Sequence, residues 1–310
     1  MIQDAEQPIA PDAARFYDGG VDADEGQPGV PPDPACPPRI ELVRTTENGC
    51  EEFKMLRRIA YNDEHLGELL VPRRTRTFCS DLTSVPTLFT WLVPKTGEHL
   101  PAALLHDGLV HPPGDPTYTS TDNHVVTREQ ADRVLRDAMG HAGTKLIRRW
   151  LIWSAVAMVT MLNGKGTGWS NRRKWYYRLA VGVTLSLVLA LGIYAFIDLF
   201  DLCDANIPKL PWMGDRPWFV EVVGGLAGAI VIPLVLALFW GRFRIAGAVV
   251  GVSLAVLLPV TVALLVPTGI YQVLEFTAKA TKAARWPALV VGVVALVVWL
   301  ALSGTALFQK

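Results

Sequence analysis

The chain has 310 residues, 51% of them hydrophobic, and its 29 basic side chains equal its 29 acidic ones in number. This balance excludes an overall field that would attract nucleic acid, so we expect no nucleic-acid partner. The apolar residues are concentrated after residue 177, which predicts that one part of the chain folds in water and the other in lipid. Four cysteines without metal-ribbon spacing are expected to remain free thiols in a reducing compartment.

Residues 1–38 contain eight prolines and many acidic side chains, but almost no periodic apolar residues. Such a segment buries too little apolar surface to offset the entropy lost on ordering, so we predict a disordered acidic arm. The first residues also lack the basic and apolar regions of a secretory signal, and no cleaved leader is expected.

The next stretch, residues 39–176, combines short β-like runs with helical patterns, which predicts a small α+β domain. Turn residues at 62–67 separate two of the β-like runs and predict a hairpin. A short helix is predicted over residues 102–110, because Pro101 stands where a first helical turn would begin.

Two further helices are predicted in the same domain. Thr127 and Gln130 have the spacing of a capping box ahead of an apolar periodicity that continues to Gly140. The apolar run from Trp150 to Leu162 is too short for a hydrocarbon core, which needs about 20 residues. We therefore expect either a core helix of this domain or a helix at the membrane interface.

Beyond residue 177 the chain contains four apolar runs of spanning length, each without a charge in its middle third. Trp218, Trp240 and Trp286 lie where aromatic side chains meet the bilayer interface. We predict that the α+β domain is followed by a membrane domain over 177–310, a four-helix transmembrane bundle. The predicted spans are 179–200, 218–240, 245–266 and 286–308.

Basic residues flank the first span and fill the second connection, whereas the first connection, 201–217, is acidic. Since positive charge favours the cytoplasmic side, we expect a multi-pass protein of the cytoplasmic (inner) membrane with both termini in the cytoplasm. The third connection, 267–285, carries basic residues on the opposite side, and its apolar face predicts an amphipathic helix at the outer surface.

Small residues mark two of the predicted spans, with Gly224 and Gly228 on one and Gly247 and Gly251 on the next. Glycines at this spacing let helix backbones approach closely. They favour close packing within the chain, and the alternative is self-association into a larger assembly. Membrane lipid is an expected partner under either interpretation.

Residues with catalytic or ligand chemistry gather ahead of this membrane region, where five of the six histidines fall between residues 99 and 141. Asp107 and His111 are four residues apart on one helical face, and His106 is adjacent to them. Asp81 from the preceding loop and Asp132 from the following helix can join them. We predict that the catalytic residues are Asp81, His106, Asp107 and Asp132, and that the metal ligands are His106, Asp107, Asp81 and His111.

Imidazole and carboxylate ligands together suit a divalent Zn, Mn or Fe ion, with bound water as the nucleophile. The alternative is a structural role for the same side chains. Asp81 can cap a turn, His106 can be a hydrogen-bonded core residue, and Asp132 can pair with Arg128 at helical spacing. The residues alone leave both interpretations open.

Three ordered motifs in this region resemble a known family. They are Ser80-Asp81-Leu82-Thr83-Ser84-Val85-Pro86, Ala102-Ala103-Leu104-Leu105-His106-Asp107-Gly108-Leu109 and Arg128-Glu129-Gln130-Ala131-Asp132. Their order is similar to that of the DUF1353 family of bacteriophage and prophage proteins, over about residues 50–170. The resemblance singles out Ser84, Pro86 and Arg128 as further motif residues. It implies a phage or prophage origin but no reaction, because the family has no established activity.

Three functions follow from these patterns. The first is a membrane-tethered cytoplasmic domain with a metal-assisted hydrolytic site. The second is a non-enzymatic phage membrane protein that acts in lysis, superinfection exclusion or virion assembly. In the third, the small domain recruits a phage or host protein through the polar loop 112–126. An HD phosphohydrolase would also place His-Asp on a helix, but the β-like runs ahead of the motif do not fit its all-helical domain.

Overall fold

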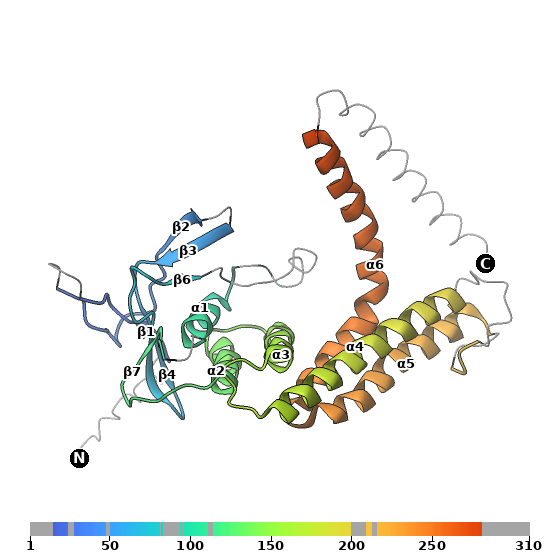
Figure 1. The fold of residues 1–310 in the computed structure, drawn as a ribbon, viewed down its shortest axis with the longest axis horizontal. Coiled ribbons are helices and arrows are strands. Elements are labelled where there is room, and N and C mark those ends of the chain that lie inside the picture. Colours follow the sequence, from blue (N-terminus) through green and yellow to red (C-terminus); the bar gives the residue numbers. More distant parts are fainter. Residues whose placement is uncertain are drawn as a thin grey trace, which may run out of the picture. The chain divides into compact units, whose positions relative to one another are not determined.

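The computed structural model describes residues 15–23, 28–47, 50–80, 82, 94, 96–110, 114–199, 209–212 and 216–280. The chain divides into two compact units, Met1–Leu179 and Ala180–Lys310. Within the described residues, the first unit combines two antiparallel sheets with helices (Figure 1). The predicted mixed α and β class is therefore confirmed for the N-terminal part of the chain.

One sheet has four strands in the order β1-β4-β5-β7, and every neighbouring pair is antiparallel. Its strands are β1 (Phe16–Asp18), β4 (Ile59–Asp63), β5 (Gly67–Val71) and β7 (Thr119–Ser120). The predicted hairpin is the pair β4 and β5. Its turn forms because the Asp63 carboxylate accepts hydrogen bonds from the backbone N–H groups of His65 and Leu66, at 3.1 and 3.0 Å.

A second sheet has three strands, in the order β2-β3-β6. The strands are β2 (Leu42–Glu47), β3 (Cys50–Met55) and β6 (Cys79–Ser80). Ser80 pairs with Phe53 of the central strand, and its side chain is buried. The first motif of the sequence therefore begins from a fixed point on this sheet.

Strand β1 corrects the prediction of a disordered arm over residues 1–38. Phe16–Asp18 pair with Ile59–Tyr61 of β4, and all three residues of β1 are buried. This part of the arm is ordered because β4 supplies backbone partners and the Arg57 guanidinium forms an ion pair with the strand's last carboxylate. Both partners are distant in sequence, so the composition of the arm contains no sign of them. Residues 1–14 lie outside the described residues.

The helices of the first unit are α1 (Leu100–Leu109), α2 (Arg128–His141) and α3 (Leu146–Asn163). Helix α1 packs on β4 and β5, α2 packs on α1, and α3 packs on α2 (Figure 1). The predicted capping box is present at the start of α2, where Thr127 and Gln130 exchange side-chain to backbone hydrogen bonds. Helix α3 begins earlier than the predicted apolar run and ends ahead of Gly164, whose φ of 60° is typical of a helix C-terminus.

The core of the first unit lies between the four-stranded sheet and these helices. Its largest fully buried side chains include Met55, Ile59, Tyr61, Leu69, Leu104, Leu105, Leu109, Met139 and Met161. The apolar residues on either side of His106 in the second motif are therefore the residues that fix α1 against the sheet.

The described part of the second unit is helical. Helix α4 (Asn171–Leu199) begins in the first unit and continues into the second, followed by α5 (Trp218–Ala237), the 3-10 turn η2 (Leu238–Phe243) and α6 (Arg244–Ala280). Two described stretches are long and apolar enough to cross a membrane, Asn171–Asp198 and Trp218–Leu257. Only 17% and 11% of their most apolar windows are buried, unlike the core helix of a soluble protein. The length and composition of these two stretches are weak evidence for membrane association.

The prediction of a four-helix bundle requires more membrane spans than these two stretches support. The second stretch contains α5, η2 and the start of α6, which correspond to two predicted spans. They meet at Gly241, whose φ of 57° and ψ of −121° favour glycine, so the predicted tight connection is present. Helix α6 continues past residue 266, the predicted end of the third span, as far as residue 280. Residues 267–280, which were predicted to belong to a separate surface helix, are therefore part of α6. The predicted span 286–308 lies outside the described residues.

Gly247 and Gly251 of the predicted spans lie against side chains of their own chain. A Cβ atom at Gly247 would lie 2.6 Å from the ring of Trp240, and one at Gly251 would lie 2.8 Å from Cβ of Pro233. Trp240 is fully buried, and its indole N–H donates to the Thr184 hydroxyl at 2.9 Å. These contacts support the interpretation that the small residues allow close packing within the chain.

Candidate functional site

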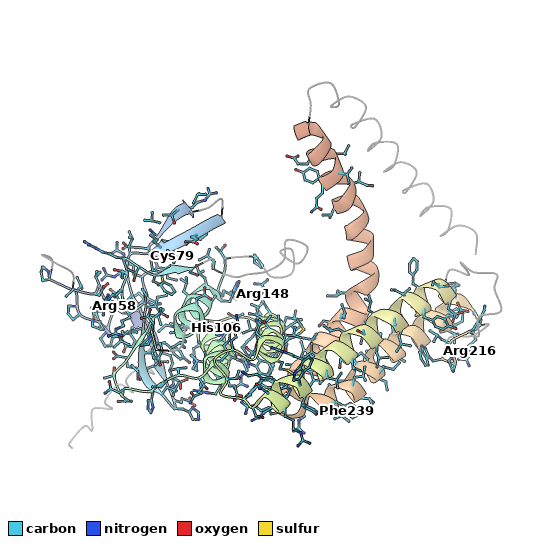
Figure 2. The ribbon with its side chains drawn as sticks, viewed as in Figure 1. Arg58, Cys79, His106, Arg148, Arg216 and Phe239 are labelled. Carbon is cyan, nitrogen blue, oxygen red and sulfur yellow. The ribbon has the colours of Figure 1, made fainter. Side chains whose placement is uncertain are left out.

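His106 lies on the buried side of α1, where its ring meets α2 (Figure 2). The residue is 7% exposed, and its Nε2 atom lies 2.9 Å from Oδ1 of Asp132. Asp132 is 2% exposed and shares the buried face of α2 with apolar residues such as Val134 and Leu135. Two of the predicted catalytic residues are therefore in direct contact inside the helix layer.

The Asp132 carboxylate is held by further donors. The Thr160 hydroxyl of α3 donates to Oδ2 at 2.7 Å, and Nε of Arg128 lies 3.4 Å from Oδ1. Nε of Arg128 also donates to the Thr160 hydroxyl at 3.1 Å, so the four side chains form one network. A carboxylate can only accept hydrogen bonds, so Nε2 of His106 is the donor in this contact. In the tautomer with the proton on Nε2, the lone pair of the ring lies on Nδ1.

Asp107 has a different described partner, although it is adjacent to His106. Successive residues on a helix point about 100° apart, and Asp107 accepts a hydrogen bond from the hydroxyl of Ser80 at the end of β6. The same hydroxyl accepts from the backbone N–H of Leu82 at 2.9 Å, and Leu82 has a φ of 64°. Asp107 therefore anchors the start of the segment that follows β6. The predicted meeting of His106 and Asp107 at one centre is not seen among the described contacts.

Four predicted site residues lie outside the described residues. They are Asp81 and His111 of the proposed metal set and the motif residues Ser84 and Pro86. The described part of the chain contains no group of three or more His, Cys, Asp or Glu side chains that could hold a metal ion. Of the predicted ligands, His106 and Asp107 lie within the described residues, and the Asp132 carboxylate orients the His106 ring through Nε2.

Thr160 belongs to the site, and the sequence did not single it out. In the sequence it is a mild polar break in the apolar run from Trp150 to Leu162. The structure shows a buried hydroxyl, 2% exposed, with a carboxylate acceptor. A polar residue at a helical position among apolar neighbours was the only signal, and it does not identify the partner.

A second charged cluster joins α2 to the β4–β5 hairpin. The Arg133 guanidinium donates to both oxygens of Asp63, at 2.7 and 3.2 Å. Burial acts to raise the pKa of Asp63, but hydrogen bonds from Arg133 and from the backbone of His65 outweigh it and hold the pKa below its ordinary value. A carboxylate paired in this way stabilises the fold by joining α2 to the hairpin.

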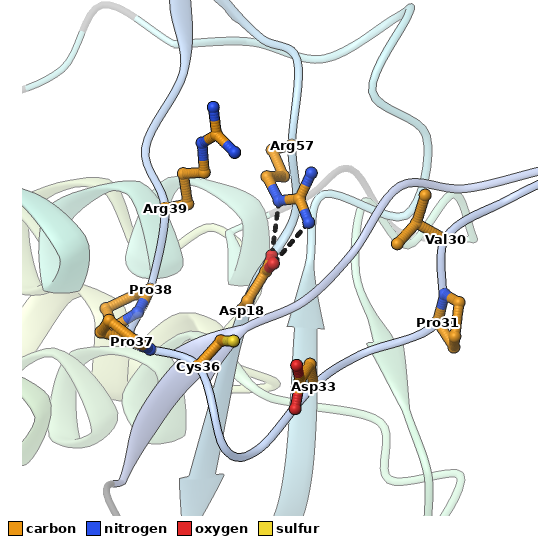
Figure 3. A pocket seen from close by; sticks show the side chains of 9 residues that line it. All are labelled: Asp18, Val30, Pro31, Asp33, Cys36, Pro37, Pro38, Arg39 and Arg57. Atoms are coloured by element: carbon orange, nitrogen blue, oxygen red, sulfur yellow. Dashed lines mark hydrogen bonds and ion pairs between the residues drawn. The ribbon is translucent and has the colours of Figure 1, made fainter.

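A hollow of about 480 Å³ lies elsewhere in the first unit, beside β1 (Figure 3). Its lining residues are Asp18, Val30, Pro31, Asp33, Cys36, Pro37, Pro38, Arg39 and Arg57. The Asp18–Arg57 ion pair crosses it, and Arg39 pairs with Glu41 at 2.7 Å. A hydrogen bond to Asp33 raises the pKa of the exposed Cys36 thiol, which disfavours the nucleophilic thiolate. The hollow contains none of the predicted site residues.

Comparison with known proteins gives one result. Residues 53–156, which are 104 of the 310 residues, match the family described as a protein of unknown function (DUF1353). Neither the search of curated proteins nor the search of solved structures found a match. The matched region contains β4, β5, α1, α2 and the first part of α3, and it therefore includes His106, Asp107 and Asp132.

Proposed function

We propose that the chain is a phage or prophage membrane protein with a metal-assisted hydrolytic site at His106. The family that matches residues 53–156, DUF1353, is described without an activity, so the proposal is based on the geometry of the candidate site. The contact between His106 and Asp132 carries the proposal. Histidine ligands of metals commonly donate their second ring nitrogen to a carboxylate, which fixes the tautomer and the orientation of the ring. The contact between His106 and Asp132 supports this role, in which Nδ1 of His106 would be the ligating atom.

Each polar residue then has a role. Asp132 orients His106 instead of binding the metal directly, and Thr160 and Arg128 hold Asp132 in place. Asp81, Asp107 and His111 would supply the remaining ligands. A Zn, Mn or Fe ion held by these residues would supply an acidified water as the nucleophile.

Metal analysis of the full chain, purified in detergent after growth with Zn, Mn and Fe, tests this proposal. We expect a stoichiometric metal in the wild type and its loss in His106→Ala. Asp132→Asn should weaken metal affinity by about 10- to 100-fold, as is usual for a residue that orients a ligand. His124→Ala, which removes an exposed imidazole from the polar loop, should keep the metal. A wild type that is folded but free of metal contradicts the proposal.

We place this site on the cytoplasmic face of the inner membrane. Support comes from the two described stretches of spanning length and from the basic residues ahead of α4. In the proposed topology four spans cross the membrane, both termini are cytoplasmic, and lipid surrounds the helices. Self-association through Gly224, Gly228, Gly247 and Gly251 is a further proposal. The packing of Gly247 on Trp240 favours close packing within the chain over self-association at this position.

The second candidate is a non-enzymatic membrane protein that acts in lysis, superinfection exclusion or virion assembly, with a soluble unit that is structural or binds a phage or host partner. The burial of His106 and Asp132 favours it, because a hydrogen-bonded pair buried inside a helix layer also stabilises the packing of the helices. Expression of residues 177–310 with measurement of membrane potential tests the lytic form of this second candidate. Dissipation of the potential supports the lytic function, and an inert membrane insert contradicts it.

A further inference from the structure

The outer face of α3 is mostly apolar, and its residues are exposed or half-buried along the helix. At about 100° per residue, Ile147, Leu151, Ala155, Met158, Val159 and Leu162 fall within an arc of about 120°. Ile147 is 76% exposed, Val159 is 41% exposed, and Leu162 is 37% exposed. The opposite arc contains the buried Trp153, Ala157, Thr160 and Met161, which face the rest of the first unit. Helix α3 therefore has two apolar faces, and only one of them lies in the protein core.

The charge around this face has one sign. Between Gly143 and Arg178 the chain has no Asp or Glu. The same segment has eight basic residues, namely Lys145, Arg148, Arg149, Lys165, Arg172, Arg173, Lys174 and Arg178. They flank both ends of the apolar face, in a chain whose total charge is zero. An apolar stripe with cations at its edges matches the cytoplasmic leaflet, where acyl chains lie beneath anionic headgroups.

The chain path places one end of this face beside the start of an apolar helix. Nε of Arg178 donates to the carbonyl of Leu162 at 2.7 Å, and its guanidinium also reaches the carbonyl of Asn163 at 3.2 Å. Arg178 immediately precedes the apolar run of α4, the first candidate span. The last turn of α3 is thus attached to α4 at the level where the chain would enter the bilayer. Trp175 and Tyr176 in the same turn are 67% and 50% exposed, as is common for aromatic residues at the interface.

We propose that α3 lies on the cytoplasmic surface of the bilayer, with its Ile147–Leu162 face among the acyl chains and the flanking lysines and arginines on anionic phospholipid headgroups. The inference rests on the proposed membrane anchoring but not on the metal site. It gives the first unit a fixed surface against the membrane, since the residues of α3 on the other side contact α2 and Asp132. The polar network of the candidate site then lies one helix away from the lipid.

A photoreactive amino acid placed at Ala155 in the full chain tests this inference, with the protein in nanodiscs of phosphatidylcholine alone or with added phosphatidylglycerol. Both Ala155 and the control position Val125, which is 81% exposed in the polar loop, are accessible. We expect lipid adducts at position 155, several-fold more with phosphatidylglycerol, and none at position 125. Lys145→Gln combined with Arg148→Gln should reduce the adducts at position 155 to the level found in phosphatidylcholine.

Other products overturn the inference. A crosslink from position 155 to another segment of the same chain shows that protein covers the face, and a crosslinked dimer shows that a second copy does. Equal lipid adducts at positions 155 and 125 show only general proximity to the membrane. Recovery of the chain outside the nanodiscs contradicts the membrane anchoring itself, so failure of the anchoring is distinguishable from failure of the α3 contact.

Discussion

At the scale of single residues, the buried His99 couples the stability of the first unit to pH. His99 precedes α1 and is 1% exposed, and both of its ring nitrogens are buried. Burial, and then the charge of Arg148, lower the pKa of its imidazole. Below about pH 6.5 the unfolded chain binds a proton that the folded chain does not, so the free energy of unfolding decreases as the pH falls through this value.

Denaturant unfolding at about pH 7.5 and about pH 5.5 measures this coupling. His99→Phe removes the titrating group, and we expect the loss of stability between the two pH values to become smaller in this variant. His124→Phe changes an exposed histidine and should keep the wild-type difference. An unchanged pH dependence in His99→Phe would show that other groups are responsible.

Two buried hydroxyls of α3 give a matched comparison at the same scale. The Thr160 hydroxyl donates to Asp132, whereas the Ser154 hydroxyl is buried without a hydrogen-bond partner among the described residues. Thr160→Val leaves a buried carboxylate oxygen without this donor, so we expect a loss of about 1–3 kcal/mol in the free energy of unfolding. Ser154→Ala removes an unpaired polar group and should be neutral or stabilising. Equal losses in the two variants would mean that the Thr160 contact contributes nothing specific.

At the scale of elements, a glycine sets the distance between α1 and the sheet. A Cβ atom at Gly108 would lie 2.2 Å from Cγ1 of Val71 on β5, and Val71 is fully buried. Valine is stiff about χ1, so it cannot move aside cheaply. Gly108→Ala should therefore reduce the free energy of unfolding by about 1–3 kcal/mol, in spite of the better helix propensity of alanine.

A double-mutant cycle with Val71→Ala shows whether this contact is the cause. In the Val71→Ala background the same substitution at Gly108 should cost less, because the clashing methyl groups are absent. Additive losses would locate the effect elsewhere in α1. Since Gly108 follows His106 and Asp107 in the same motif, metal analysis of Gly108→Ala would also show how far the helix position determines the site.

At the scale of the whole molecule, the topology of the predicted membrane spans determines which side of the membrane the candidate site faces. We predict that a reporter active only outside the cytoplasm is active when fused in the acidic first connection, after Asp204, and inactive when fused after Arg242. A reporter active only in the cytoplasm should show the reverse, and it should also be active at the C-terminus. An inactive cytoplasmic reporter at the C-terminus would indicate an odd number of spans.

Local patterns predicted several features correctly, since the interactions that form them lie within a few residues. The hairpin turn depends on Asp63 and the two backbone N–H groups that follow it. The start of α2 depends on Thr127 and Gln130, three residues apart. The mixed α and β class and the DUF1353 match follow from the order of such local motifs.

Tertiary contacts decided the rest, because a sequence pattern does not state which distant residue will meet which. Strand β1 became ordered through β4, some 40 residues away, and Asp132 found its hydroxyl donor on α3 at Thr160. His106 and Asp107 are neighbours in sequence, but helix geometry gave each a different partner. The amino-acid sequence by itself determined most of the helices and the separation of polar from apolar segments. Packing determined the donor network around the histidine, since the donors that stabilise the buried Asp132 carboxylate come from residues distant in sequence.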